Sequence, residues 1–99
     1  MLILQTLARG KPLHGFEIAE SIQQTSADVL QVEEGSLYPA LQRMLKAGWI
    51  DAEWGMSPRH RKVRIYRITR AGRKRLEHEI SSFEQMLEGI ARVMRPVRS

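Results

Sequence analysis

The chain has 99 residues, no cysteine and a formal net charge of +5. This length suits one small domain with at most one appended element, and it excludes an enzyme built from separate cofactor and substrate domains. Without cysteine, disulfides, thiolate catalysis and zinc–thiolate fingers are excluded as well. The longest apolar run near the start, residues 2–4, is too short for a signal peptide or a membrane span, so we expect a soluble, cytoplasmic protein.

The charge is divided unevenly along the chain. Residues 1–54 carry four basic and seven acidic side chains, a net −3, whereas residues 55–99 carry twelve basic and four acidic ones, a net +8. Nine Lys or Arg and no acid lie between Gly55 and Arg75. A solvated basic face is the simplest explanation, but an acid-free block of one sign is more typical of a surface that meets a polyanion.

The first quarter of the sequence predicts two short helices. Apolar side chains at helical spacing over residues 1–8 are followed by a glycine and a proline, and a second apolar face runs from about His14 to Gln24. Because the three histidines lie far apart in the sequence, we expect His14 to shape the start of the second helix rather than to bind a metal. A short β-prone run then predicts one edge strand, formed by Val29, Leu30 and Val32.

A third helix is predicted over about Leu37–Ala47. Ser36 is the expected N-cap, because its hydroxyl can accept a hydrogen bond from one of the first free amides. Pro39 then falls in the first turn, where a missing N–H costs little. Gly48 is well placed to end this helix in the left-handed conformation.

Two β-prone runs follow, residues 49–54 and 62–69, and the loop between them is polar and basic. This pattern predicts a β-hairpin with a basic tip. Core packing against the helices is the expectation for Trp49 and Trp54, and a place in an aromatic effector site is the alternative.

The last helix is expected to be capped by Thr69 and to run to about Met94, before Pro96. Its apolar side chains recur at spacings of three and four residues, which is an a/d heptad seam: Leu76, Ile80, Phe83, Leu87, Ile90 and Met94. About 25 residues make a rod about 38 Å long. Residues 1–69 form too small a head to cover such a stripe, so we expect part of the seam to pair with a second copy.

This order of elements predicts a mainly α fold with a small β-hairpin, that is, a winged helix-turn-helix over residues 1–69 followed by a dimerisation helix over 70–99. A helix of this kind fits the major groove, and a basic hairpin fits the neighbouring backbone. The candidate DNA-binding residues are Ser36, Tyr38, Pro39, Gln42, Arg43, Arg59, Arg61, Lys62 and Arg64. The candidate dimer-interface residues are Leu2, Ile3, Leu76, Ile80, Phe83, Leu87, Ile90 and Met94.

Roles differ among the candidate DNA-binding residues. Gln42 or Arg43 could read a base edge, and the basic hairpin would supply attraction that is independent of sequence. The Tyr38 hydroxyl could hold a phosphate, but an ordinary half-buried aromatic packing on the second helix is the alternative. For Ser36, capping is the more ordinary role.

Four segments carry a resemblance to a known family: Pro-Leu-His-Gly-Phe-Glu-Ile at 12–18, Glu-Gly-Ser-Leu-Tyr-Pro-Ala-Leu at 34–41, Gly-Trp-Ile at 48–50, and Tyr-Arg-Ile-Thr-Arg-Ala-Gly at 66–72. Together they resemble the pattern of PadR-type transcriptional regulators over nearly the whole chain. The segment at 34–41 is the most specific of them. Two departures are Arg70, where the family often has proline, and a first helix that begins at Met1, where members usually have preceding residues.

The resemblance implies a dimeric, mostly repressing bacterial DNA-binding protein of the family's smaller branch, whose C-terminal helix makes the dimer. In some relatives a hydrophobic cleft at the dimer interface accepts planar aromatic compounds. By analogy, a small aromatic effector could bind here in a cleft lined by Phe83, Met86, Leu87 and Ile90.

The sequence therefore predicts a homodimeric winged-helix transcription regulator, in the simplest case a repressor, that binds a palindromic operator in double-stranded DNA. The alternative is a winged-helix module that binds another protein and not DNA, and a third possibility is an RNA-binding factor or a small enzyme. No metal-ligand spacing, phosphate-binding glycine loop or nucleophile signature is visible. We therefore expect no catalytic residue, no metal and no cofactor.

Overall fold

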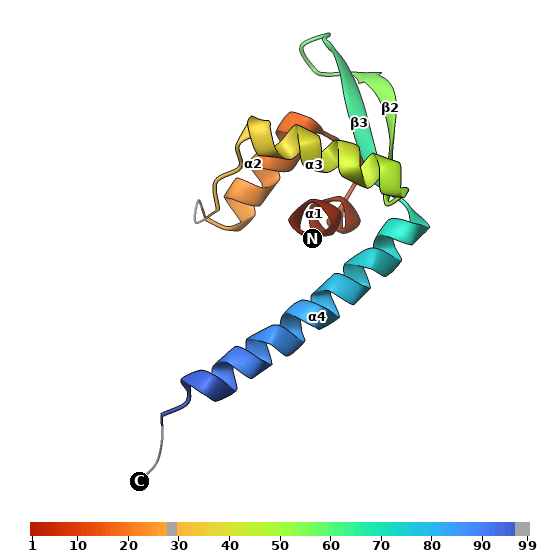
Figure 1. Ribbon diagram of the computed structural model, residues 1–99. Helices are drawn as coiled ribbons and strands as arrows, with labels where there is room; N and C mark the ends of the chain where they lie inside the picture. The colour runs from red at the N-terminus through yellow and green to blue at the C-terminus, as the bar shows by residue number, and fades with distance from the viewer. Residues whose placement is uncertain (28–29, 97–99) are drawn as a thin grey trace.

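The computed structural model of the chain describes residues 1–27 and 30–96, except for the side chain of Glu34. In these residues the elements follow one another as α1 (Leu2–Arg9), β1 (Leu13–His14), α2 (Gly15–Thr25), α3 (Glu34–Ala47), β2 (Ile50–Met56), β3 (Lys62–Ile68) and α4 (Arg70–Met94). Figure 1 shows a head made of the first three helices and the hairpin, from which α4 extends as a rod. The predicted winged helix-turn-helix with a long C-terminal helix is confirmed.

The three strands form one antiparallel sheet in the order β1-β3-β2. The edge strand predicted after the second helix is wrong for residues 30–32, which form no strand, and Val29 lies outside the described residues. The third strand is instead Leu13–His14, on the other side of α2 in the sequence. Pro12 keeps this segment from continuing a helix, and the free edge of β3 offers backbone groups for it to pair with.

The start of α2 depends on His14, as the sequence predicted. The Nδ1 atom of His14 accepts a hydrogen bond from the backbone N–H of Glu17, and the Glu17 carboxylate accepts one from the backbone N–H of His14. This reciprocal capping box pairs two amides that would otherwise lack partners in the first turn. It also fixes the angle at which α2 leaves β1.

The predicted start of α3 is wrong. The helix begins at Glu34, and Ser36 is not its N-cap, because the backbone N–H groups of Ser36 and Leu37 both already donate to the carbonyl of Glu33. Pro39 therefore lies in the second turn rather than the first. Because proline has no N–H, the carbonyl of Gly35 lacks its usual helical donor, and Gly35 is exposed. The end is as predicted, since Gly48 adopts the left-handed conformation with φ 79°.

The base of the hairpin is tied to α4 through Thr69. Its hydroxyl accepts a hydrogen bond from the backbone N–H of Gly72 at 3.0 Å, which confirms the predicted cap, and donates to the carbonyl of Gly48 at 2.6 Å. The backbone N–H of Thr69 also donates to the Trp49 carbonyl at 3.0 Å. Gly72 lies so close to this carbonyl that a Cβ there would collide with it. These contacts set the direction in which α4 leaves the head.

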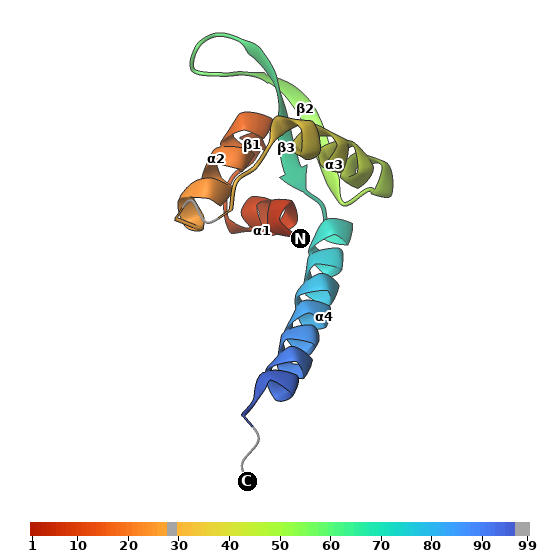
Figure 2. The same cartoon turned by 60° about the vertical axis from the view of Figure 1, so that its left-hand side comes forward.

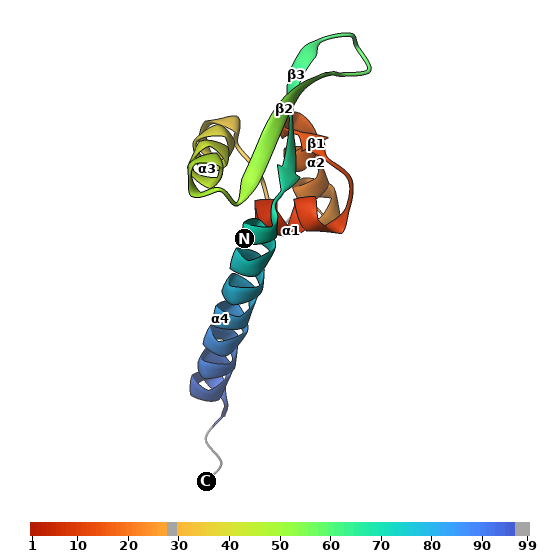
Figure 3. The same cartoon turned by 90° about the vertical axis from the view of Figure 1, so that its right-hand side faces the viewer.

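The core is formed where α1 lies against α2, α3, the sheet and the first turns of α4. Its fully buried centre is Leu4, Ile18 and Leu41. The other buried apolar residues are Ile3, Leu7, Ile22, Leu37, Ile50, Tyr66 and Leu76. Only the first turns of α4 reach this core, and the three views agree that the rest of the helix points away from the hairpin tip (Figures 1, 2 and 3).

Candidate nucleic-acid interface

The tip of the hairpin is a tight turn that presents basic side chains to solvent. The backbone N–H of Arg61 donates to the Ser57 hydroxyl, and the Ser57 N–H donates to the Arg61 carbonyl. His60 adopts a positive φ of 61° inside this turn, and its N–H donates to the carbonyl of Ser57. The side chains of Arg59 and Arg61 are exposed in this turn, and the hairpin tip lies at the end of the molecule opposite α4 (Figure 1).

Helix α3 presents one exposed face beside the hairpin. At 100° per residue, Pro39, Gln42 and Lys46 lie along the centre of this face. Tyr38 lies on the edge next to the hairpin, and Ser36 and Arg43 lie on the opposite edge. All five predicted residues of α3 are exposed. The five side chains therefore share one outward face. One edge of this face borders a hollow beside the hairpin, and the other edge borders a hollow beside α1.

The basic side chains on the two faces of the hairpin have different partners: carboxylates on one face and an aromatic ring on the other. On one face Arg67 is directly opposite Asp51 and pairs with its carboxylate at 3.4 Å and with that of Glu53 at 3.6 Å. On the other face Trp54 is directly opposite Arg64. The Lys62 Nζ lies 4.9 Å and the Arg64 guanidinium 5.3 Å from the centre of the Trp54 ring.

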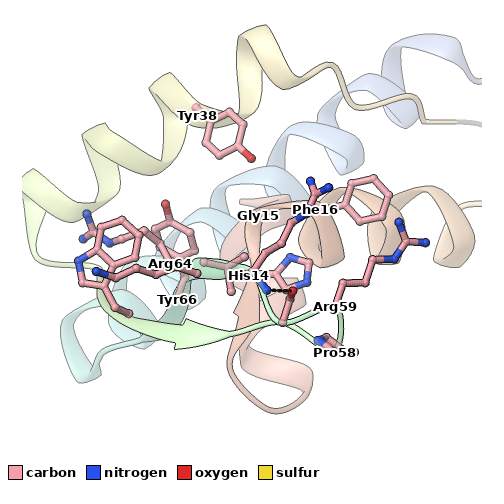
Figure 4. Close-up of a pocket in the computed structure, with 13 residues that line it drawn as sticks. His14, Gly15, Phe16, Tyr38, Pro58, Arg59, Arg64 and Tyr66 are labelled. Carbon is pink, nitrogen blue, oxygen red and sulfur yellow. Dashed lines mark hydrogen bonds between the residues drawn. The ribbon is translucent and has the colours of Figure 1, made fainter.

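The second face forms one wall of a hollow of about 680 Å³, which we call the wing groove. The other walls are the start of α2 and the side chain of Tyr38. In Figure 4 Tyr38 hangs from α3 with its hydroxyl directed toward the groove, while Arg64 and Tyr66 rise from the hairpin and Phe16 stands at the far end. The full lining is His14, Gly15, Phe16, Tyr38, Trp54, Ser57, Pro58, Arg59, Arg61, Lys62, Val63, Arg64 and Tyr66.

The electrostatic character of the wing groove is positive. No acidic side chain occurs among the described residues that line it, whereas four of them are basic. Burial raises the pKa of the Tyr66 hydroxyl above its usual value, against a lowering effect of nearby Arg64 and with a smaller raising effect of Tyr38. Tyr66 is therefore neutral near pH 7, and the groove keeps its positive charge.

The structure places the candidate DNA-binding residues in two groups. Tyr38 and the four basic candidates of the hairpin, Arg59, Arg61, Lys62 and Arg64, line the wing groove. Ser36 and Arg43 instead border a second hollow of about 500 Å³, beside α1 and the segment before α3. Gln42 and Pro39 lie between the two groups, on the exposed face of α3.

Sequence reasoning missed part of the groove. Trp54 was expected in the core, but it is 60% exposed, because the hairpin projects past the helices that cover its base. Phe16, which was expected on the apolar face of α2, is exposed as well. Ile50, Ala52 and Trp54 share one face of β2, and along this face the structure passes from buried Ile50 through half-buried Ala52 to exposed Trp54.

The heptad seam of α4 divides into a covered part and an open part. Leu76 is buried and Ile80 is half-buried against the head, and Ile3 of α1 belongs to the same core. Beyond Ile80, the seam leaves the head and exposes Phe83, Leu87, Ile90 and Met94, with Met86 and Val93 beside them. Leu2 is also exposed. A single copy therefore leaves an apolar stripe along the outer half of α4.

Neither a metal cluster nor a membrane span is found in the described part of the chain. Within residues 1–27 and 30–96, no three His, Asp or Glu side chains gather as metal ligands. Among the same residues, no helix is both long and apolar enough to cross a bilayer.

A three-helix head with a β-wing and a protruding C-terminal helix defines the class of winged-helix transcription regulators. Residues 3–78 match the model of the transcriptional regulator PadR-like family, and the chain belongs to this family.

Solved structures show the same likeness. A transcriptional regulator from Clostridium thermocellum is 26% identical, with 95% of this chain and 90% of that chain covered and a TM-score of 0.86. A PadR-like transcriptional regulator from Bacillus cereus is 25% identical, with 96% and 89% covered and a TM-score of 0.78. PadR of Bacillus subtilis, solved in complex with operator DNA, shares the fold at 20% identity, with 80% and 45% covered and a TM-score of 0.70.

Proposed function

We propose that this protein is a homodimeric transcription regulator that binds a palindromic operator in double-stranded DNA and acts as a repressor. One observation carries the proposal: the exposed face of α3 and the acid-free wing groove lie at the same end of the head, and a rod with an exposed apolar stripe leaves the other end. The complex of PadR from Bacillus subtilis with operator DNA, a protein of the same fold, supports this proposal.

In this proposal α3 enters the major groove. Its exposed face offers Gln42 and Arg43, whose side chains have the donor and acceptor geometry that base edges require. The Tyr38 hydroxyl and the Ser36 hydroxyl, on opposite edges of the face, reach toward the flanking phosphates. Pro39 contributes apolar surface at the centre of the contact.

The hairpin supplies attraction that does not depend on sequence. Arg59, Arg61, Lys62 and Arg64 lie along the wing groove without an acid to neutralise them. If about three of these cations in each subunit contact phosphate, the logarithm of the affinity falls with the logarithm of the salt concentration at a slope of about −5.

Dimerisation is assigned to residues 70–99, and DNA binding to residues 1–69. Pairing of two α4 helices covers the outer seam, which no part of the described head covers. A two-fold axis between the rods places two α3 helices symmetrically. Half-sites about 34–36 Å apart on one side of the duplex then form a palindrome.

A band-shift titration tests DNA binding directly. The full chain is titrated into fragments of the source genome at about 50 mM salt, bound fragments are footprinted, and the footprint is examined for two-fold symmetry. Transcription in vitro from the footprinted promoter then falls if the protein is a repressor. No retarded fragment at any protein concentration below about 10 μM contradicts the proposal and favours a protein-binding module, because even non-specific binding is tighter than this at low salt.

A further inference from the structure

The groove face of the hairpin holds two cations against one exposed aromatic ring. Trp54 is exposed, although tryptophan is mostly buried in proteins. Both Lys62 and Arg64 lie within cation–π distance of its ring. The Arg64 Nε is closed off from solvent and has no hydrogen-bond partner among the described residues. Packing against the ring, rather than a hydrogen bond at Nε, therefore orders this part of the Arg64 side chain.

The opposite face of the same hairpin provides the comparison. There Arg67 is held by the carboxylates of Asp51 and Glu53. Those ion pairs orient the guanidinium, but they also cancel its charge, so Arg67 attracts an incoming anion only weakly. An indole ring orients a cation through its quadrupole and leaves the full positive charge in place. The hairpin thus neutralises the cation on one face and preserves the two on the other.

We propose that Trp54 is a positioning residue for the DNA backbone: its ring holds Lys62 and Arg64 as a charged pair in the wing groove, ready to receive a phosphodiester group. This inference rests on the proposed DNA-binding function and adds a specific anchor to it. Lys and Arg side chains lose rotational freedom when they are fixed at an interface. Here much of that ordering is complete before DNA arrives, because both side chains already rest on the ring.

A phosphodiester is the anion that fits this place. The two cations project from the hairpin into a groove that Tyr38 of α3 also lines, so they lie beside the helix that is proposed to enter the major groove. Tyr38 faces them across the groove and can donate a hydrogen bond from its hydroxyl to the same strand of the backbone.

The test separates positioning from charge. The variant Trp54→Leu removes the ring and keeps an apolar side chain, whereas Lys62→Ala removes a charge. Affinity for a footprinted duplex and for an unrelated duplex is measured by fluorescence anisotropy from about 50 to 300 mM salt. We expect Trp54→Leu to weaken binding to both duplexes about three- to tenfold with an unchanged salt slope. We expect Lys62→Ala to weaken binding and to flatten the slope by about 0.9 for each phosphate that is no longer neutralised.

Conservative variants and the second tryptophan serve as controls. Trp54→Tyr and Trp54→Phe keep a ring and should restore part of the affinity in that order, which a role in folding alone does not predict. Trp49 also lies under a cation, with the Arg75 guanidinium 4.8 Å from its ring, but it is outside the groove. Trp49→Phe should therefore leave DNA affinity within about twofold. Melting temperatures of all variants show whether each is folded.

The fluorescence of the two tryptophans also reports directly on where DNA binds. In Trp49→Phe the remaining indole is Trp54, and its emission should change when the duplex is added. In Trp54→Phe the remaining indole is Trp49, and its emission should stay constant. A change confined to Trp54 places the DNA at the wing groove.

The outcomes separate the proposed function from the role of Trp54. If the parent protein binds no DNA at 50 mM salt, the proposed function is wrong and this inference falls with it. If the parent binds and Trp54→Leu binds equally well, or if Trp54→Phe is no better than Trp54→Leu, only the role of Trp54 is refuted. A slope in Trp54→Leu that is flattened as much as in Lys62→Ala refutes pre-ordering, because loss of the ring would then remove phosphate contacts themselves and not only the ordering of the two side chains.

Discussion

Replacement of Phe83 by Asp is expected to dissociate the dimer. Phe83 lies in the open part of the seam, one helical turn beyond half-buried Ile80, and 41% of its surface is exposed in a single copy. A fully covered phenylalanine buries roughly 200 Å², so about 80 Å² remains for a partner to cover. At about 25 cal/mol per Å², this area is worth about 2 kcal/mol in each copy.

Symmetry doubles the effect. Because a two-fold interface contains each residue twice, the substitution removes about 4 kcal/mol of apolar burial, which corresponds to about three decades in the dimer dissociation constant. The new carboxylate adds a further cost, since it is either buried without a partner or forces the helices apart. We therefore expect the dissociation constant to rise by about a thousandfold or more.

Sedimentation velocity over about 0.1–100 μM measures this shift. The matched control is Ser81→Asp, which adds the same charge to an exposed position on the opposite side of α4 and should leave the dimer intact. Far-ultraviolet circular dichroism checks that both variants keep the helix. If Phe83→Asp sediments as a dimer over the same range as the parent, the outer seam does not form the interface and the assignment of residues 70–99 is wrong.

Three further predictions concern the wing, the hairpin base and α4. Arg61→Ala should weaken binding to all duplexes alike and flatten the salt slope by about 0.9 for each phosphate that is no longer neutralised. An unchanged slope would show that the wing tip does not contact the DNA. Gly72→Ala should lower the free energy of unfolding by about 2 kcal/mol or more, and the melting temperature by about 10 °C, because its Cβ collides with the rigid carbonyl of Trp49. A melting temperature equal to that of the parent in calorimetry would show that α4 does not leave the head in this direction. Partial burial raises the pKa of Glu79, but hydrogen bonds and charge from Arg75 and from the N-terminal amino group outweigh it and hold the pKa below its ordinary value of 4.5. The stability that this carboxylate contributes is therefore complete above about pH 5 and is lost as the pH falls through the lowered pKa. Glu79→Gln should reduce the free energy of unfolding by about 0.5 kcal/mol at pH 7, and the stabilities of variant and parent should converge in acid. A difference in stability that is constant at every pH would argue against the ion pair.

The helix boundaries that depend on local chemistry could be read from the sequence. The cap that Thr69 places on the Gly72 amide and the left-handed Gly48 each involve groups only a few residues away, and His14 caps α2 through its neighbour Glu17. Such interactions need no distant part of the chain. The start of α3 could not be predicted in this way. The amides of Ser36 and Leu37 donate to the backbone carbonyl of Glu33, so Ser36 is already inside the helix and no side-chain cap marks its start.

The partners of β3 could not be read in the same way. The sequence pointed to the region around residues 29–32 for the remaining strand, since β-branched side chains gather there. The tertiary structure places Leu13–His14 beside β3 instead, because the chain entering α2 passes along that edge. Strand pairing depends on which segments meet in space, and intrinsic β propensity is a weak guide to it.

The sequence by itself determined the class of fold, the acid-free basic stretch from Gly55 to Arg75 and the heptad seam, because periodicity and charge are properties of the order of residues. The tertiary structure alone decided how far the helices cover the hairpin and the rod. It buried Leu76 and left Phe83 open on α4, and it left Trp54 exposed between two cations on the hairpin. Burial depends on the distance of each residue from the rest of the head, and no local pattern in the chain records that distance.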